Sequence, residues 1–74
     1  MGNVPVLKRR EVVKILERMG FVEIRQRGSH KQFNHADGRF TTVPMHQGRD
    51  ISPFLLRKIA EDLKTTVEEL LKYR

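Results

Sequence analysis

A histidine surrounded by cations stands near the middle of the chain, in the stretch RQRGSHKQF. His30 follows a Gly-Ser pair, and Arg25, Arg27 and Lys31 lie close to it in sequence. Histidine titrates near neutral pH and can give or take a proton, while Arg and Lys bind phosphate. These residues suit the cleavage of RNA, whose own 2′-hydroxyl can attack the adjacent phosphorus while His30 moves a proton. The competing interpretation is an ordinary polar histidine on a solvated strand.

A metal site is the second chemistry that the histidines allow. His30, His35 and His46 offer nitrogen ligands, and Asp37 offers oxygen. Their spacing matches no familiar zinc pattern, and His35 is expected to point away from His30, so we expect no metal and no other cofactor. His46 is predicted to lie in a loop, where it either contacts RNA or takes part in catalysis, or simply caps the loop.

The first strand pattern carries both arginines. Val22 and Ile24 alternate with Glu23 and Arg25, which is the period of a half-buried strand. We therefore expect Val22 and Ile24 to face the core, and Arg25 and Arg27 to face outward. The strands are predicted over residues 21–26, 30–35 and 39–44.

The second and third strands are joined by HADGRF, in which Asp-Gly is a strong hairpin signal. A two-residue turn would pair Phe33 with Thr42. A three-residue loop with Gly38 left-handed would pair Phe33 with Thr41 and put Val43 on the face of Phe33. We prefer the second register because it gathers the apolar residues on one face.

This register decides which side chains share a face. Alternation along the strand places His30 opposite Phe33, on an open face that Arg25 and Arg27 are also expected to share. Phe40 falls on the same face, where it is either a partly buried strand residue or a platform on which a base stacks. A histidine and two arginines can thus meet on one exposed surface.

Helices are predicted on both sides of the strands. Residues 9–19 form an amphipathic helix that Gly20 ends. Ser52 and Pro53 begin a second helix, as N-cap and first-turn proline, and Thr66 caps a short third one. We expect a solvated helix surface for most of the basic residues on the polar faces of these helices, which are Arg9, Arg10, Lys14, Arg18, Arg57 and Lys58.

Composition favours a polyanionic partner. The chain of 74 residues, interpreted as a single domain over 1–74, has 15 Lys and Arg against 9 Asp and Glu and a net charge of +6. Such an excess favours nucleic acid. There is no cysteine, and no apolar run approaches the ~20 residues of a membrane helix. We therefore expect a cytoplasmic protein with no membrane association.

The C-terminal segment LLRKIAEDLKTTVEELL offers a different class of function. A helix, a short turn and a capped second helix resemble part of a helix-turn-helix DNA-binding motif. However, Glu68 and Glu69 stand at the start of the second helix, where a recognition helix would meet DNA. Because acidic residues oppose the phosphate field, two packed helices are the preferred interpretation.

The run GSHKQFNHADGRFTTVPMHQGRDISPFLLRKI and the residues that precede it are similar to the HicA family of toxins from bacterial toxin–antitoxin pairs. The resemblance extends from about Leu7 to Leu71. It departs at Pro53-Phe54 and at Lys64, where the family more often has Gly-Thr and a glycine. The motif residues that carry it, in this order and spacing, are Gly28-Ser29-His30, Phe33, Asp37-Gly38-Arg39, Thr42-Val43-Pro44 and His46.

The resemblance implies a double-stranded-RNA-binding-like α+β fold, α-β-β-β-α, with a three-stranded antiparallel sheet and helices on one face. It implies an endoribonuclease that cuts mRNA, a HicB-type antitoxin that silences it, and a catalytic role for His30. The candidates for RNA contacts are Arg25, Arg27, Lys31 and His46. Proteins that only bind RNA share the fold, so a non-catalytic RNA-binding module is the alternative, ahead of the DNA-binding one.

Overall fold

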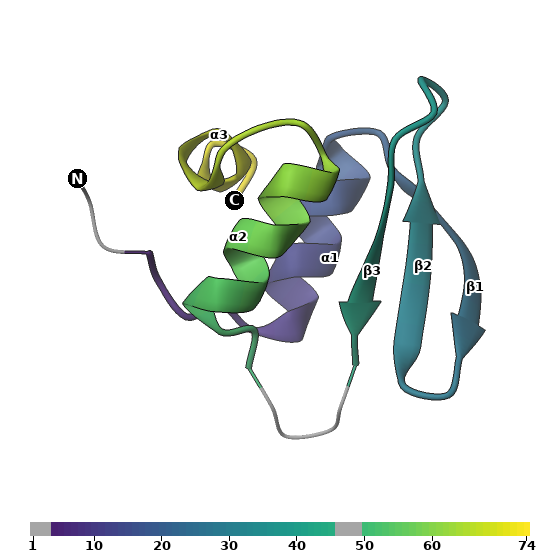
Figure 1. Cartoon of the computed structure of the whole chain (residues 1–74), viewed down its shortest axis with the longest axis horizontal. Coiled ribbons are helices and arrows are strands. Elements are labelled where there is room, and N and C mark those ends of the chain that lie inside the picture. Colours follow the sequence, from purple (N-terminus) through teal and green to yellow (C-terminus); the bar gives the residue numbers. More distant parts are fainter. Residues whose placement is uncertain (1–3, 46–49) are drawn as a thin grey trace.

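The predicted order of helices and strands is confirmed by a computed structural model, which describes residues 4–45 and 50–74 (Figure 1). The strands form one antiparallel sheet in the order β1-β2-β3. The elements are α1 (Arg9–Arg18), β1 (Val22–Arg27), β2 (His30–Asn34), β3 (Phe40–Pro44), α2 (Pro53–Asp62) and α3 (Val67–Leu71).

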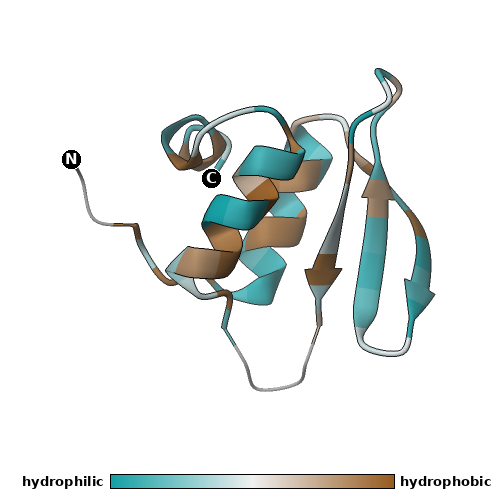
Figure 2. Cartoon of the chain, viewed as in Figure 1, coloured by the Kyte–Doolittle hydropathy of each residue, from teal (hydrophilic) through white to brown (hydrophobic). Residues whose placement is uncertain are grey.

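The helices lie on one side of the sheet and leave its other face open. Both α1 and α2 contact β3, whereas β1 is the strand farthest from the helices (Figure 1). Hydrophobic residues are concentrated in the helices and at the end of β3, and β2 is mostly hydrophilic (Figure 2). The core is formed by Leu7, Val12, Ile15, Leu16, Phe21, Phe33, Val43, Ile51, Leu56, Ile59, Ala60, Leu63 and Leu70.

The β2–β3 hairpin has the register that the apolar pattern favours. Phe33 pairs with Thr41 across a loop in which Gly38 has φ +98°. This places the buried Phe33, Thr41 and Val43 on the face toward the helices. The Thr41 hydroxyl donates to Asp62 Oδ2 at 2.9 Å, so this buried polar group is satisfied and also ties β3 to α2.

The prediction that Val22 and Ile24 face the core is wrong. Their exposed fractions are 63% and 52%, and every residue of β1 is exposed. A register shift between Glu23 and Arg25 adds one residue to β1 at this point, so that Val22 and Arg25 lie on the same face. β1 is also an edge strand, and it lies beyond the part of the sheet that the helices cover.

The predicted helix starts are confirmed. Ser52 Oγ accepts the backbone N–H of Leu55, and Thr66 Oγ1 accepts that of Glu69. An isolated bridge between Leu7 and Ile51 joins the segments that lead into α1 and α2. Within residues 4–45 and 50–74, no helix is long and apolar enough to cross a membrane.

Candidate nucleic-acid interface

The face of the sheet turned away from the helices, which we call the open face, carries basic, uncharged polar and apolar side chains. Cross-strand pairing and alternation define its members. No Asp or Glu is among those that the structure describes, which are Val22, Arg25, Arg27, His30, Gln32, Asn34, Phe40, Thr42 and Pro44. A surface with arginines and no carboxylate attracts polyanions.

His30 and Arg27 lie opposite each other at one end of this face. They are Cα partners on β2 and β1, a relation that brings Cβ atoms to about 5 Å. The connecting turn depends on Gly28, whose φ of +55° is left-handed, and Gln26 Nε2 donates to the Gly28 carbonyl at 2.9 Å. Both His30 and Arg27 are exposed, so a phosphate can approach a cation and a proton-transfer group together.

Arg25 occupies the next position along the open face, across from Gln32. Neither Arg25 nor Arg27 makes a side-chain hydrogen bond or ion pair with a residue that the structure describes. Their guanidinium groups are therefore available to an incoming anion without the loss of an internal partner. The sequence prediction that Arg25, Arg27 and His30 share a surface is met by this geometry.

Lys31 is on the other side of the sheet from His30. Successive strand residues point to opposite faces, and Lys31 Nζ lies 3.3 Å from Glu23 Oε1 on the face toward the helices. The structure therefore brings Arg25 and Arg27 to His30, but not Lys31. His46, the remaining candidate for RNA contact, lies outside the described residues.

His35 has structural contacts instead of a place on the open face. Its ring centroid is 5.0 Å from that of the buried Phe21, and its Nδ1 accepts the backbone N–H of Asp37 at 3.0 Å. Asp37 in turn accepts hydrogen bonds from the backbone N–H and the Nε of Arg39, at 3.0 and 2.8 Å. These bonds, led by the one from the Arg39 backbone, hold the pKa of the Asp37 carboxyl below its usual value. These contacts of His35, Asp37 and Arg39 hold the loop between β2 and β3 in place.

The hypothesis of a histidine metal site finds no ligand set in the described part of the chain. No group of three or more His, Cys, Asp or Glu side chains is placed there to hold a metal ion. His30 starts β2 and lies on the open face, whereas His35 follows β2 and packs toward Phe21. His46 is not among these residues.

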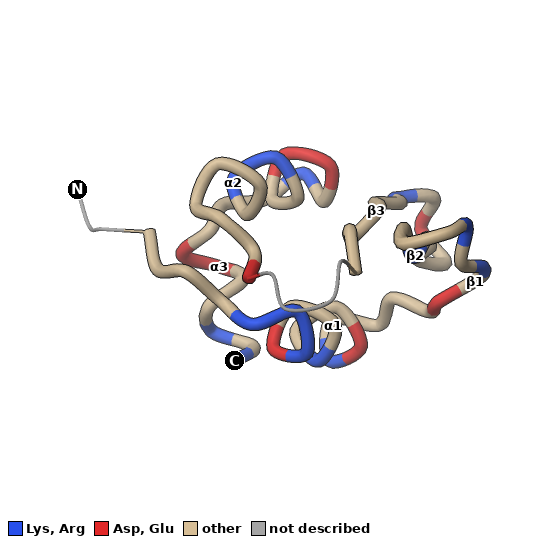
Figure 3. Tube along the Cα trace, turned by 90° about the horizontal axis from the view of Figure 1, so that it is seen from below, with Lys and Arg blue, Asp and Glu red and all other residues tan. Residues whose placement is uncertain are grey.

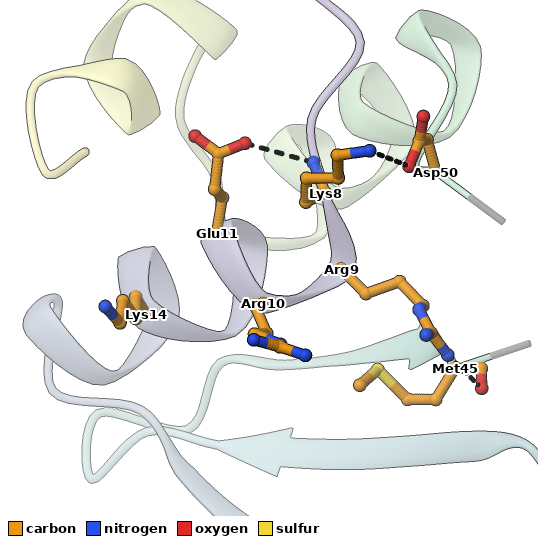
Figure 4. A pocket seen from close by; sticks show the side chains of 7 residues that line it. All are labelled: Lys8, Arg9, Arg10, Glu11, Lys14, Met45 and Asp50. Carbon is orange, nitrogen blue, oxygen red and sulfur yellow. Dashed lines mark hydrogen bonds and ion pairs between the residues drawn. The ribbon is translucent and has the colours of Figure 1, made fainter. Parts of the chain in front are cut away.

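A second group of cations lies at the start of α1, around an open cavity of about 690 Å³ (Figure 4). Lys8 Nζ is 3.4 Å from Asp50 Oδ1, and Arg9 Nη1 donates to the Met45 carbonyl at 2.8 Å. The Lys8 backbone N–H, bonded to Glu11 at 3.1 Å, holds the pKa of the Glu11 carboxyl below its usual value, with help from Arg74.

At least one basic residue of α1, Arg9, is more than a solvated surface residue. Arg9 ties the first turn of α1 to the end of β3, and the backbone N–H of Met45 donates to the Ser29 carbonyl beside His30. This role of Arg9 has no local signal in the sequence, because the two partners are 36 residues apart. Basic residues occur on α1, on α2 and on the sheet (Figure 3), and those of the open face stand apart by having no carboxylate among them.

The fold and the open face together define a class: a small basic α+β protein of the double-stranded-RNA-binding-like type, with a cationic face that suits nucleic acid. Residues 9–65 match the sequence model of the family described as HicA toxin of bacterial toxin–antitoxin. The match covers most of the chain, and the protein belongs to the HicA toxin family. A comparison with curated protein sequences gave no match.

Proposed function

We propose that this protein is a toxin that cleaves mRNA as an endoribonuclease, with His30 as the general acid or base. One observation carries the proposal. In a chain of the HicA toxin family, an exposed histidine lies directly across from Arg27 on a sheet face that has no carboxylate among its described residues. A polyanionic substrate meets no repulsive group there, and the proton-transfer group is at the same end as the cation.

The proposed reaction uses the substrate's own nucleophile. The 2′-oxygen forms a bond to the adjacent phosphorus while the bond from phosphorus to the 5′-oxygen breaks. His30 either takes the proton from the 2′-hydroxyl or gives one to the leaving 5′-oxygen, and water makes the other of these two proton transfers. The products are a 2′,3′-cyclic phosphate and a 5′-hydroxyl. Because RNA supplies the nucleophile, a metal ion is not required to generate one.

Arg25 and Arg27 hold the RNA backbone and offset the charge that develops on phosphorus, because guanidinium groups can bond phosphate oxygens in pairs. Ser29 is a turn residue in this scheme, since the nucleophile is the 2′-hydroxyl. Lys31 makes no direct contact with RNA in this scheme and adds only to the overall positive potential of the protein, because it pairs with Glu23 on the other face. His46 stays a candidate for RNA contact.

A HicB-type antitoxin completes the proposal. Membership of a toxin–antitoxin family supports a protein inhibitor, and the open face is the surface that such an inhibitor would have to cover. We propose that it blocks RNA from His30 by binding there.

The mechanism is tested with purified protein and mRNA, in the presence and absence of EDTA. Cleavage should persist with EDTA, and the fragments should carry 2′,3′-cyclic phosphate and 5′-hydroxyl ends. An oligoribonucleotide with one 2′-deoxy nucleotide at a mapped cleavage position should resist cutting there. Fragments with 5′-phosphate ends, or activity that disappears with EDTA and returns with zinc or magnesium, would exclude this mechanism.

The non-catalytic alternative makes a different prediction in the same experiment. An RNA-binding module would retain mRNA in a gel-shift assay and leave it intact at every protein concentration. A helix-turn-helix protein would instead shift duplex DNA. Against that last function, α3 spans five residues and carries Glu68 and Glu69 in its first turn, features that do not suit a recognition helix in the major groove.

A further inference from the structure

An exposed aromatic residue lies at the far end of the open face from His30. Phe40 is the first residue of β3, and 66% of its surface is exposed, whereas Phe33 on the neighbouring strand is fully buried. Phe40 pairs with Asn34, which pairs in turn with Val22, itself 63% exposed. The prediction of a partly buried Phe40 is therefore wrong: its ring lies outside the core, and core packing does not account for it.

The open face changes in character from one end to the other. The row at the β1–β2 turn contains Arg27 and His30, and the next row contains Arg25, Gln32 and Thr42, all able to form hydrogen bonds. The last row contains Val22, Asn34 and Phe40, and two of these three side chains are apolar and exposed. A nucleotide chain has the matching chemistry, since it combines charged phosphates, polar sugars and base edges, and flat apolar base faces.

We propose that Phe40 is a stacking platform for one base of a single-stranded RNA whose scissile phosphate lies at His30. This inference rests on the function proposed above and assigns a residue that positions the substrate. The charge of the face favours a polyanion, because Arg25 and Arg27 belong to it and no described carboxylate does. The basic character is strongest toward His30, since the hollow beside Phe40 is lined by Asp37, Glu61 and Asp62 as well as by Arg39 and Lys64. Glu23, the only acidic residue of β1, is turned to the other face toward Lys31.

The spacing determines which nucleotide reaches Phe40. His30 and Asn34 are the first and last residues of β2, so about 13 Å separates their Cα atoms at ~3.3 Å per residue. Phe40 lies beside Asn34. Stacked nucleotides advance by only ~3.4 Å each, so the base on Phe40 belongs to a nucleotide some positions away from the cleaved bond.

Stacking on Phe40 requires an unpaired base. In an A-form duplex the base faces are covered by their neighbours, whereas loops and single strands expose them to aromatic side chains. Stacking tolerates all four bases because each has a π-face. The inference therefore predicts a substrate that is single-stranded on one side of the cut, with little preference for the identity of the stacked base.

The test replaces the ring while keeping an apolar side chain. Phe40→Leu preserves a hydrophobic strand residue and removes the π-face, and Phe40→Trp restores one. The matched control is Phe54→Leu, because Phe54 is 76% exposed but lies in α2, away from the sheet. The first readout is cleavage kinetics on a short single-stranded oligoribonucleotide with one mapped cut. The second is binding of the His30→Ala protein, in which cleavage is slowed, to the same RNA with 2-aminopurine at successive positions.

We expect Phe40→Leu to raise KM about 10-fold with kcat nearly unchanged, and Phe40→Trp and Phe54→Leu to behave like the unaltered protein. One 2-aminopurine position should be quenched on binding to His30→Ala, and this quenching should be lost in His30→Ala/Phe40→Leu. Unchanged KM and quenching in the Phe40→Leu proteins would overturn the inference. If only antitoxin binding weakened, the ring would belong to a protein interface instead.

Failure of the proposed function gives a different pattern. An intact RNA with quenching that depends on Phe40 would refute the ribonuclease and leave the stacking platform standing on an RNA-binding module. Cleavage that depends on His30 without any effect of Phe40→Leu would refute the platform alone. Melting temperatures of all variants identify any loss of folding, and Phe40→Trp keeps the comparison valid if leucine perturbs β3.

Discussion

Two histidines that lie close together in sequence have different surroundings. His30 begins β2 and is exposed on the open face. His35 follows β2, packs at a tilt against the ring of the buried Phe21, and accepts the backbone N–H of Asp37. Strand alternation alone predicted that they would face opposite ways. It could not predict that His35 would be half-buried, because Phe21 comes from a different segment of the chain.

Exchange of each histidine for alanine should separate catalysis from stability. His30→Ala should change the free energy of unfolding by no more than about 0.5 kcal/mol, as is usual for exposed residues. It should lower the cleavage rate by about 10²-fold or more. His35→Ala should lower the free energy of unfolding by about 1–3 kcal/mol, because the Asp37 N–H loses its acceptor and Phe21 loses the ring that packs at a tilt against it.

Denaturant unfolding and cleavage assays at a temperature where both variants are folded provide the comparison. The His35→Ala protein should cut RNA at the normal rate per folded molecule. A His30→Ala protein that is clearly destabilised but still cleaves would identify His30 as an ordinary strand residue.

The Asp37 carboxylate should make the hairpin loop sensitive to acid. Its pKa in the folded state is lowered, first by the hydrogen bond from the Arg39 backbone N–H and then by the Arg39 side chain. The unfolded chain therefore takes up the proton at a higher pH than the folded one, near ~3.9. The stabilisation is complete above that pH and is lost as the pH falls through the folded-state pKa.

The measurement is the melting temperature of the unaltered protein and of Asp37→Asn at pH 7, 5, 4 and 3. The gap between them should narrow below pH 4, because asparagine can still accept the Arg39 N–H but has no charge to lose. Glu17→Gln is the control, since Glu17 is exposed on α1. A gap for Asp37→Asn that stays constant down to pH 3 would contradict the assignment.

At the scale of elements, α1 and α2 end in the same way with different residues. After α1, Gly20 has φ +96°, and the N–H groups of Gly20 and Phe21 donate to Glu17 and Leu16. After α2, Lys64 has φ +58°, and the N–H groups of Lys64 and Thr65 donate to the carbonyls of Glu61 and Ala60. Both are Schellman motifs, which favour glycine at the left-handed position. Lys64 therefore takes a conformation that glycine would adopt without strain.

Lys64→Gly should therefore stabilise the protein. A side chain in the left-handed region costs roughly 1–2 kcal/mol, and glycine gives back part of this through its more flexible unfolded state. We expect a gain of about 1 kcal/mol in the free energy of unfolding. Lys58→Gly, at an exposed position inside α2, should instead lose about 1 kcal/mol.

Both variants are compared with the unaltered protein by urea unfolding. The sign of the change in the free energy of unfolding tests whether position 64 is left-handed. If Lys64→Gly lost stability as Lys58→Gly does, the left-handed ending of α2 would be refuted. Neither lysine lies on the open face, so cleavage should be unaffected in both.

The elements also show what the sequence can and cannot predict. The β2–β3 register followed from Phe33, Val43 and the Asp-Gly turn, because only one register gathers the apolar residues. The shift at Ile24 had no local signal, since neither a glycine nor a proline marks it. Exposure of β1 depends on where the helices stop covering the sheet, and that is a property of tertiary packing. Arg25 and Arg27 nevertheless lie on the open face.

At the scale of the whole molecule, some of the basic side chains have a carboxylate partner and others have none. Lys8, Lys31, Arg39 and Arg74 each have a carboxylate within ion-pair distance, and these partners are Asp50, Glu23, Asp37 and Glu11. The described arginines of the open face have none. The excess of +6 predicted a polyanionic partner. Helix residues such as Lys14 and Arg57 also have no ion pair within the described residues, so the open face is distinguished by carrying arginines and no described carboxylate. Lys31, grouped with these arginines by sequence, is compensated by Glu23.

This distribution predicts how an antitoxin should bind. Covering Arg25 and Arg27 with an apolar surface would remove their hydration without replacement, which is costly. The antitoxin should therefore place Asp or Glu side chains opposite them, and the two proteins should attract each other before contact. Association should slow as salt rises, because the Debye length falls from ~10 Å at 0.1 M to ~3 Å at 1 M. RNA and antitoxin should compete for the open face.

Stopped-flow association of the HicB-type partner with Arg25→Ala/Arg27→Ala should be slower than with the unaltered protein and less dependent on salt. Arg57→Ala/Lys58→Ala removes the same charge from α2 and should affect association less, since those residues lie outside the proposed interface. In the complex, His30 should be protected from chemical modification and RNA cleavage should stop. A partner that abolished cleavage while binding over the helices and leaving His30 accessible would defeat steric inhibition. It would require a change transmitted through the sheet from the face that the helices cover.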